Sequence, residues 1–435
     1  MDMGTARSAQ PESTRPVAPA SQQAESIGTP LASVRPDAKR ICVVGLGYIG
    51  LPTASLLGSR GHAVRGVDID PSVVETINAG AIHIVEPDLD VMVQGAVRMG
   101  RLHAALEPDE AEIFILAVPT PIRADKSPDL TAVEAATRAI VPYIRRGNLV
   151  ILESTSPVGT TDGVVGRILA ESGLEIGHDV HLAYCPERVL PGRILTELVE
   201  NDRIVGGINQ ASTEAAVEFY ETFVRGEVLS TDARTAEMVK LTENSSRDVN
   251  IAFANELSVI ASEWGVSVWE LIRLANRHPR VNIHQPGPGV GGHCIAVDPW
   301  FIVHGAPEQA RLIRTAREVN DAKPDWVVER VAARAAQVKE PVIACLGLSF
   351  KANVDDLRQS PAVDIVRKLQ GMQLGELIVC EPHLASHPEF VLTRLDDALE
   401  RANIVLVLVD HKHFARIPRE VLHEKILIDT RGLFQ

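Results

Sequence analysis

Short hydrophobic runs alternate with stretches of helical periodicity along most of the chain. The runs cover residues 41–44, 63–67, 113–118, 149–152, 180–183 and 203–205, and the helical stretches between them include residues 132–143. A second series lies near the C-terminus, at residues 342–347, 377–380, 404–409 and 426–428. Such alternation is typical of parallel sheets covered by helices on both faces. It predicts an α/β fold with two doubly wound, Rossmann-like parallel-sheet domains.

A long helical pattern separates the two series and would join the domains as a central helix. It runs from Thr235 to about Asn276 without proline and with Gly265 as its one interruption, and a further helix is expected over residues 307–322. Lys240, Asn244 and Arg247 fall on one face of the long pattern. A charged stripe of this kind is either solvent-facing or, beside apolar residues, part of a site.

Composition and charge exclude several classes of protein. The chain has 435 residues, 45% of them hydrophobic, and no apolar run approaches the roughly 18 residues of a membrane span. A net charge of −14 argues against a nucleic-acid or anionic-membrane partner, because binding to either requires a positively charged protein surface. Five cysteines without metal-ligand spacing predict a reducing, cytoplasmic compartment and no metal site. Residues 1–38, rich in Ala, Ser and Pro, predict a disordered extension.

A glycine-rich turn follows the first hydrophobic run. Gly45, Gly47 and Gly50 form a GxGxxG motif between a predicted strand and a predicted helix, and Asp68 ends the next strand. Glycines in this position let a pyrophosphate approach the helix N-terminus, while the acid accepts hydrogen bonds from ribose hydroxyls. An acid there disfavours a 2′-phosphate. The motif therefore predicts NAD rather than NADP, the alternative being a doubly wound sheet with an empty crevice.

A second glycine-rich segment, residues 287–300, contains Cys294. Its Gly and Pro content excludes a regular helix or central strand, and Asp298 follows the cysteine by four residues. We expect a reactive thiol, because a polar, backbone-rich loop favours the thiolate. Most lone cysteines are simply buried, and the other four in the chain mostly fit that plainer role. Lys240, if partly desolvated, could act as an acid or base.

Together these motifs resemble the UDP-glucose/GDP-mannose dehydrogenase family over residues 39–435. The resemblance rests on both glycine-rich segments, the long helical pattern, and the segments ESTSPVGTT (153–161), YCPERVLPGR (184–193) and RHPRVN (277–282). Within the family, these motifs are most similar to those of members that oxidise UDP-N-acetyl-D-mannosamine. The resemblance implies a four-electron oxidation of the sugar C6 alcohol to a carboxylate with two NAD, through a thiohemiacetal and a thioester on Cys294.

The resemblance also implies roles for individual residues. Lys240 is expected to be a general acid/base, Asn244 to share in stabilising the oxyanion, and Asp298 to support the lysine or activate water. Glu187 is expected to help orient water or the base. Besides the three glycines, the residues expected to hold NAD are Tyr48, Ile49, Asp68, Thr120 and Thr155. Those expected to hold the UDP-N-acetyl-hexosamine are Arg188, Val189, Lys240, Asn244, Arg247, His278, Arg280, Gly291, Lys351 and Arg431. A homodimer formed through the central helix would supply His278 and Arg280 from the neighbouring subunit.

The predicted organisation has four parts. These are the extension (1–38), the NAD-binding Rossmann domain (39–225), the central helical and dimerisation region with the catalytic loop (226–323) and the UDP-sugar-binding Rossmann-like domain (324–435). The turn at residues 347–351 lacks a third glycine, so a nucleotide held by Lys351 fits it better than a second dinucleotide. An ion pair of Lys351 or Arg358 with Asp355 or Asp356 is the plainer alternative.

Two departures from the family pattern bear on specificity. UDP-glucose members have Ser where this chain has His293, and a second acid where it has Pro191, which is consistent with a 2-acetamido sugar. Three other functions stay open. They are a 6-dehydrogenase for UDP-N-acetylglucosamine or another UDP-hexose, a nucleotide-sugar-binding protein without turnover, and a two-electron 2-hydroxyacid dehydrogenase, which would have no use for Cys294.

Overall fold

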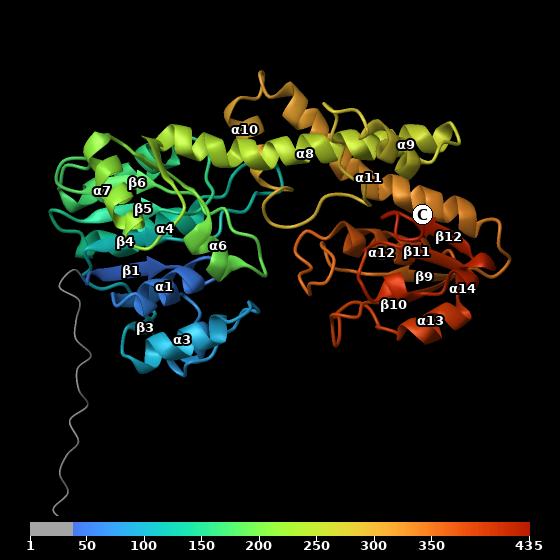
Figure 1. Cartoon of the computed structure of the whole chain (residues 1–435), viewed down its shortest axis with the longest axis horizontal. Helices are drawn as coiled ribbons and strands as arrows, with labels where there is room; N and C mark the ends of the chain where they lie inside the picture. Colours follow the sequence, from blue (N-terminus) through green and yellow to red (C-terminus); the bar gives the residue numbers. More distant parts are fainter. Residues whose placement is uncertain (1–37) are drawn as a thin grey trace, which may run out of the picture. The chain divides into compact units, whose positions relative to one another are not determined.

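The computed structural model describes residues 38–435 of the chain (Figure 1). All but the last residue of the predicted extension lies outside the described residues. The described part is built on two sheets with helices around them, and the two predicted Rossmann-like units are confirmed.

The first sheet has eight strands in the order β3-β2-β1-β4-β5-β6-β7-β8. All neighbouring pairs are parallel except β6 and β7, which run antiparallel, whereas the sequence pattern predicted a parallel sheet throughout. The strands are β1 (Arg40–Val44), β2 (Ala63–Val67), β3 (Leu102–Ala105), β4 (Ile113–Leu116), β5 (Leu149–Leu152), β6 (His181–Tyr184), β7 (Arg203–Gly207) and β8 (Val228–Asp232). β3 and β8 were not among the predicted runs, since neither is a continuous hydrophobic stretch.

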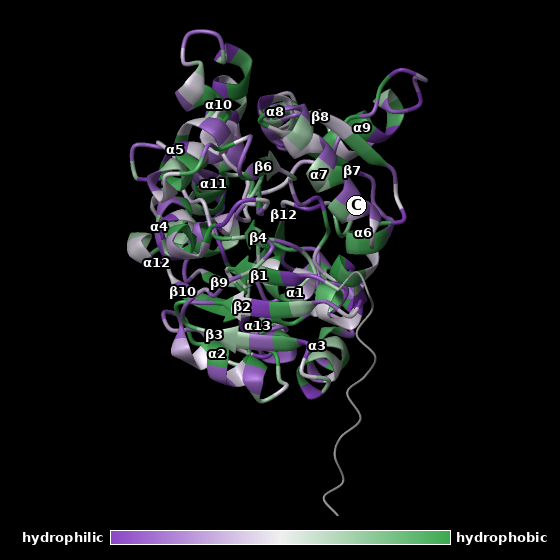
Figure 2. Cartoon of the chain, turned by 90° about the vertical axis from the view of Figure 1, so that its left-hand side faces the viewer, coloured by the Kyte–Doolittle hydropathy of each residue, from purple (hydrophilic) through white to green (hydrophobic). Residues whose placement is uncertain are grey.

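Helices cover both faces of this sheet, and a separate hydrophobic core lies on each face. One face is covered by α1 (Gly50–Ser59), α3 (Leu89–Arg98), α6 (Ile194–Glu200) and α7 (Gln210–Glu221). The other is covered by α4 (Thr131–Ile140), its 3-10 extension η1 (Val141–Tyr143), the π-turn η2 (Thr161–Val165) and α5 (Gly166–Leu169). The remaining elements are α2 (Pro71–Asn78) and η3 (Ala170–Ser172). Helix α3 shows both green and purple residues in Figure 2, as expected of an amphipathic helix whose Leu89, Val93 and Ala96 are buried.

The central region contains the longest helix of the described chain, α8 (Ala233–Glu263). The predicted helix of residues 235–276 is divided at Gly265, whose φ of +68° ends α8 and allows α9 (Val268–Ala275) to start in a new direction. The part of the second glycine-rich segment that precedes Asp298, residues 287–297, contains Cys294 and is called the thiol loop. Helix α10 (Asp298–Gly305) follows it, and α11 (Arg311–Ala335) packs along α8. Here Pro324 does not end a helix at residue 322 as predicted. The helix continues through it, because Val327, Val328 and Val331 are buried beyond it.

A buried polar network joins α8 to α11. The Arg317 guanidinium lies 2.6 Å from the carboxylate of Asp248, and Asn320 donates to the same carboxylate at 2.8 Å. The side-chain amide of Asn255 in turn donates to Asn320 at 2.8 Å. Because buried charges need paired and hydrogen-bonded surroundings, this network fixes one helix against the other.

The second sheet has four parallel strands in the order β10-β9-β11-β12. They are β9 (Val342–Leu346), β10 (Glu376–Cys380), β11 (Ile404–Val407) and β12 (Ile426–Asp429), matching the predicted runs closely. Helices α11 and α12 (Pro361–Met372) cover one face. The other carries α13 (Leu395–Arg401), η4 (Phe414–Arg416) and α14 (Arg419–His423). β12 forms an open edge with its residues half-buried.

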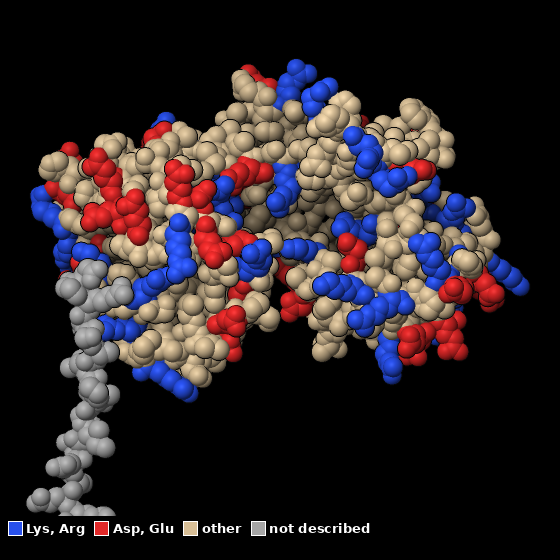
Figure 3. Space-filling view, viewed as in Figure 1, with Lys and Arg blue, Asp and Glu red and all other residues tan. Residues whose placement is uncertain are grey.

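Acidic and basic side chains are interspersed on the face of the molecule drawn in Figure 3. Many form surface ion pairs such as Arg367 with Glu389 at 2.8 Å, which contribute little to stability individually. Within residues 38–435, no helix has the length and apolar character needed to cross a membrane.

Candidate active site

The first glycine-rich turn has the geometry of a dinucleotide-binding loop. Gly45 has φ +93°, and a Cβ on Gly50 would lie 1.7 Å from the carbonyl oxygen of Gly45, so the turn tolerates no side chain at either position. A Cβ on Gly47, by contrast, would meet nothing within 4 Å, which leaves open space beside the start of α1. Tyr48 and Ile49 lie partly exposed at that helix start. These features fit NAD, whose pyrophosphate needs close backbone approach.

Asp68 lies at the end of β2 next to this turn. One carboxylate oxygen accepts the backbone N–H of Leu46 at 3.0 Å, and the other accepts that of Asp70 at 3.0 Å. These bonds orient the carboxylate beside the glycine turn and leave further acceptor capacity for ribose hydroxyls. The predicted ribose acid is thus placed at the predicted turn.

Thr120 and Thr155 follow β4 and β5, and the sheet brings them together. The Thr120 hydroxyl donates to the backbone carbonyl of Thr155 at 2.5 Å. The loop after Thr155 is held from α8, because the buried carboxylate of Glu237 accepts the backbone N–H groups of Gly159 at 2.5 Å and Thr161 at 2.8 Å. Helix α8 therefore anchors the loops at the carboxyl ends of β4 and β5, where both threonines lie.

The thiol loop meets α8 at the chemical centre of the site. The Cys294 carbonyl accepts the backbone N–H of Asp298 at 2.8 Å, so the loop turns directly into α10 and places the acid one turn after the thiol. Asp298 is 3% exposed, and its carboxylate accepts a 2.6 Å hydrogen bond from the Asn244 side-chain amide. Lys240 lies one turn before Asn244 on α8. Two pairs that are far apart in sequence, Lys240 with Asn244 and Cys294 with Asp298, are thus brought together.

Burial governs the protonation of this cluster. It raises the pKa of Asp298 to about 7, against the opposing effects of the Asn244 hydrogen bond and the Lys240 charge. Burial, with the Asp298 charge, also raises the pKa of Cys294 to about 11, although Lys240 and Arg358 act in the other direction. The prediction that the loop favours a thiolate is therefore wrong for the resting protein.

Glu187 lies in a buried cluster that the sequence did not reveal. Its carboxylate pairs with Arg203 at 2.8 Å and accepts the backbone N–H of Arg188 at 2.6 Å. Glu153, also buried, accepts a 2.7 Å hydrogen bond from the Tyr220 hydroxyl, and burial raises its pKa to about 7. Because Arg203 and the backbone N–H of Arg188 both engage the Glu187 carboxylate, its contacts suit a residue that positions Arg188 better than a free base.

Besides Lys240 and Asn244, the residues predicted to hold the sugar nucleotide lie in three places. Arg188 pairs with Glu243 of α8 at 2.8 Å, and Arg247 is exposed on α8. Val189 packs against the hydrophobic core on the face of the first sheet that α1, α3, α6 and α7 cover. At the second of these places, Gly291 packs against the turn after β9, where a Cβ would lie 2.7–2.8 Å from Gln359, Phe350 and Pro361. Lys351 is exposed on that turn, and Arg431 pairs with Asp410 at 2.9 Å after β12. His278 and Arg280 are exposed on the turn after α9.

Arg358 is a residue whose place the sequence left undecided. It forms the predicted ion pair with Asp356 at 2.6 Å, and it also lies 5.1 Å from the ring of Tyr48 in the NAD turn. Its backbone carbonyl accepts the N–H of Gly292 at 3.1 Å. Arg358 therefore contacts both the cofactor turn and the thiol loop, a role that spacing alone could not indicate.

Three family models match the chain in order. They are the NAD-binding domain (residues 39–224), the central domain (residues 234–322) and the UDP-binding domain (residues 344–435) of the UDP-glucose/GDP-mannose dehydrogenase family. The chain belongs to the UDP-glucose/GDP-mannose dehydrogenase family. As a member it is an NAD-dependent nucleotide-sugar dehydrogenase, and the predicted family, enzyme class and cofactor are confirmed.

Two curated relatives cover nearly the whole enzyme. An NDP-N-acetyl-D-galactosaminuronic acid dehydrogenase of Ralstonia nicotianae is 59% identical over 409 residues, which are 92% of this chain and 97% of the relative. A UDP-N-acetyl-D-mannosamine dehydrogenase of Escherichia coli K12 is 52% identical over 416 residues, which are 91% of this chain and 99% of the relative.

Solved structures of family members have the same fold. The UDP-N-acetyl-mannosamine dehydrogenase Cap5O of Staphylococcus aureus matches with a TM-score of 0.85 and 43% identity, covering 91% of this chain and 95% of Cap5O. A UDP-D-ManNAc dehydrogenase of Pyrococcus horikoshii matches with the same TM-score and 40% identity, covering 91% and 96% of the two chains.

Proposed function

We propose that this dehydrogenase oxidises the C6 alcohol of UDP-N-acetyl-D-mannosamine to the carboxylate, using Cys294 as a covalent nucleophile. The observation that carries the proposal is the convergence of Cys294, Asp298, Asn244 and Lys240. A simple alcohol dehydrogenase needs a base but no thiol. A thiol is required where an aldehyde must first gain a nucleophile before it can lose a second hydride.

The oxidation divides into two hydride losses, for each of which NAD held at the glycine turn would supply the hydride acceptor. For the first, Lys240 or Asp298 takes the proton of the C6 hydroxyl. The sulfur of Cys294 then adds to the aldehyde carbon, and the resulting oxyanion is protonated to give a thiohemiacetal. Loss of that proton and of the second hydride leaves a thioester. Water cleaves the thioester, which releases the carboxylate and restores the thiol.

Each residue of the cluster has its own part in the proton transfers and in charge stabilisation. Asp298 is a candidate base for the thiol, because its carboxylate acts on the pKa of Cys294 and therefore lies within electrostatic reach of it. Lys240 stabilises the oxyanion at the thiohemiacetal and thioester stages, and the Asn244 amide keeps Asp298 in place. Preorganised polar groups in a buried site stabilise such a negative charge more strongly than water does.

The similar proteins support two different epimers of the sugar. The manno configuration is supported by the Escherichia coli relative and by the two structural matches, whose names state N-acetyl-mannosamine. The galacto configuration is the second candidate, because the Ralstonia relative, named for N-acetyl-D-galactosaminuronic acid, is the more similar in sequence. Both are 2-acetamido sugars, as the replacements at His293 and Pro191 suggest.

We further propose that the enzyme works as a homodimer through its central region. Three large apolar side chains of α8 and α9 are strongly exposed in the single chain: Phe253 (51%), Trp264 (75%) and Leu274 (54%). Exposed apolar groups gathered on neighbouring elements mark an association surface. Such a dimer would bring His278 and Arg280 of one subunit, at the end of α9, toward the site of the other.

The experiment is a measurement of NADH formed per sugar consumed, with the UDP derivatives of N-acetylmannosamine, N-acetylgalactosamine and N-acetylglucosamine supplied separately. Two NADH per sugar from the manno compound, with a hexuronate product, is the expected result. Cys294→Ser should stop turnover before free product is released. Two NADH from another epimer only would change the substrate and keep the mechanism, whereas one NADH from every sugar would exclude the thioester route.

A further inference from the structure

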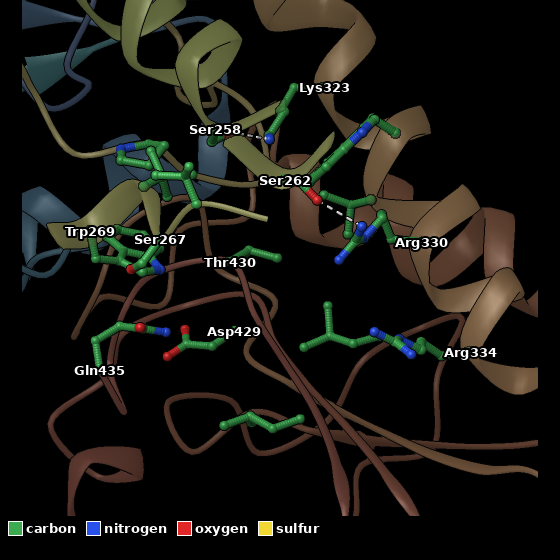
Figure 4. A pocket seen from close by; sticks show the side chains of 18 residues that line it. Ser258, Ser262, Ser267, Trp269, Lys323, Arg330, Arg334, Asp429, Thr430 and Gln435 are labelled. Atoms are coloured by element: carbon green, nitrogen blue, oxygen red, sulfur yellow. Dashed lines mark hydrogen bonds between the residues drawn. The ribbon is translucent and has the colours of Figure 1, made fainter. Parts of the chain in front are cut away.

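A pocket of about 330 Å³ lies between α8, α9, α11 and β12 (Figure 4). Its volume is at the lower end of the range found for small-molecule sites. None of the residues assigned above to NAD, to the sugar nucleotide or to catalysis lines it. Most of its residues come from the second half of α8, the start of α9, one face of α11 and the open edge of the second sheet. Pro286 and Gly287, at the start of the segment that contains Cys294, and Gln435 complete the lining.

Three basic side chains of α11 face this pocket. Lys323, Arg330 and Arg334 recur at helical spacing and point toward its interior in Figure 4. Lys323 is 4% exposed, yet its ammonium donates only to the Ser258 hydroxyl, at 2.5 Å, and lies 3.7 Å from the ring centre of Trp326. A buried ammonium normally has an anionic partner.

No such partner is present in the described part of the chain. Arg330 donates to the hydroxyl of Ser262 at 2.7 Å, and none of the three cations has a carboxylate within 4.0 Å among residues 38–435. Asp429 lines the pocket, but its carboxylate accepts the backbone N–H groups of Arg431 at 3.0 Å and Phe434 at 2.9 Å. The lining therefore holds three basic side chains against the one acidic side chain of Asp429, and none of the three is paired with it.

The other walls favour an anion that carries a flat ring. Helix α9 begins at this pocket, with Ser267, Val268 and Trp269 in the lining, and the N-terminus of a helix adds partial positive charge. Trp269 supplies aromatic surface, while Val266, Val327 and Leu427 are apolar. The ring of Trp326 is already in contact with cations, since Lys323 lies 3.7 Å and Arg330 5.4 Å from its centre. Inorganic phosphate alone would leave this aromatic and apolar surface unused.

We infer that the pocket binds a nucleoside phosphate as a second ligand, separate from NAD and from the sugar nucleotide. The phosphate lies among Lys323, Arg330 and Arg334, and the base packs against Trp269 and the apolar side chains beside it. Burial and the nearby Arg330 lower the pKa of Lys323 to about 7. An anion beside it raises that pKa, so binding near neutral pH takes up a proton.

The test is calorimetric titration of the full-length enzyme with UMP, AMP and inorganic phosphate, in two buffers that differ in ionisation enthalpy. Arg330→Gln and Lys323→Met are compared with Arg311→Gln, which removes an exposed arginine from the first residue of the same helix, outside the pocket. Circular dichroism and thermal unfolding confirm that each variant folds.

At least one nucleotide is expected to lose tenfold or more of its affinity in both pocket variants and to bind Arg311→Gln like the wild type. The KM values for NAD and for the UDP-sugar are expected to stay within about twofold. Proton uptake on binding should disappear in Lys323→Met. Equal nucleotide affinity in all four proteins overturns the proposal. A parallel rise in the KM for the UDP-sugar overturns it too, because the pocket would then belong to the substrate site. Phosphate binding as tightly as the nucleotides overturns the role of the base.

Discussion

The side-chain amide of Asn244 donates a 2.6 Å hydrogen bond to the buried carboxylate of Asp298. This bond joins the long central helix to the helix that follows the thiol loop. It also stabilises the charged form of an acid that burial pushes toward neutrality. The protonation state of Asp298 near pH 7 thus depends on this amide as well as on the Lys240 charge.

Removal of that amide should move the pH profile of the reaction. The rate is expected to fall as pH drops through about 7, where Asp298 becomes protonated. In Asn244→Leu the carboxylate loses the bond that lowers its pKa, so the acidic limb should shift upward by about one pH unit. Initial rates from pH 5.5 to 9 measure the shift. An unchanged limb together with a lower maximal rate would show that a different group controls it.

Asp298 should also make the folded protein less stable at alkaline pH. Its folded pKa of about 7 lies above the ordinary value of 3.8, so its contribution is fully present below pH 3.8 and is lost as pH rises through 7. Asp298→Asn is therefore expected to be more stable than the wild type at pH 8, by roughly 1–3 kcal/mol, while losing activity. Urea unfolding at pH 8 and pH 5 checks this, and the difference should shrink at the lower pH.

The resting thiol should react slowly with alkylating agents at neutral pH. Burial raises the pKa of Cys294 to about 11, and the other four cysteines are buried. The rate of modification by iodoacetamide should therefore rise about tenfold per pH unit between pH 7 and 10. Cys294→Ala supplies the background rate. A plateau already reached at pH 8 would mean that the thiolate forms far more easily than the surroundings of Cys294 indicate.

Arg203 should be essential for the stability of the first domain. It lies between two buried carboxylates, at 2.8 Å from Glu187 and within electrostatic reach of Glu153. Arg203→Met is expected to cost about 3–5 kcal/mol in the free energy of unfolding, since it leaves buried charge without a partner. Adding Glu187→Gln should restore part of the loss. Denaturation curves of the two variants decide this, and equal stability of both would contradict the pairing.

Periodic features of the sequence predicted most of the fold. Continuous runs such as residues 149–152 gave strands at their observed bounds, because a strand buried on both faces needs hydrophobic residues throughout. β8 was missed since its residues VLSTD are mostly exposed at a sheet edge. Pro324 misled the prediction of α11 because local preference favours a helix end there, whereas packing of the residues beyond it does not.

The site was predictable where its chemistry follows from local patterns, and less so where it depends on distant contacts. Asp68 and the glycine turn are neighbours in a short βαβ unit, so spacing alone placed them. Glu187 meets Arg203 only through the antiparallel pairing of β6 and β7, which the sequence pattern did not contain. The protonated state of Cys294 likewise depends on burial, and composition of the loop pointed the other way.

Helix α8 sets a distance as well as an orientation. Glu237 holds the loop after β5, and Asn255 accepts the backbone N–H of Gly287 in the thiol loop at 2.8 Å. At about 3.6 residues per turn these two anchors lie five turns, or about 27 Å, apart on the same face of the helix. Inserting one residue between them would rotate one anchor by about 100° relative to the other. The number of residues between the two anchors therefore matters to this chain independently of which side chains occupy them.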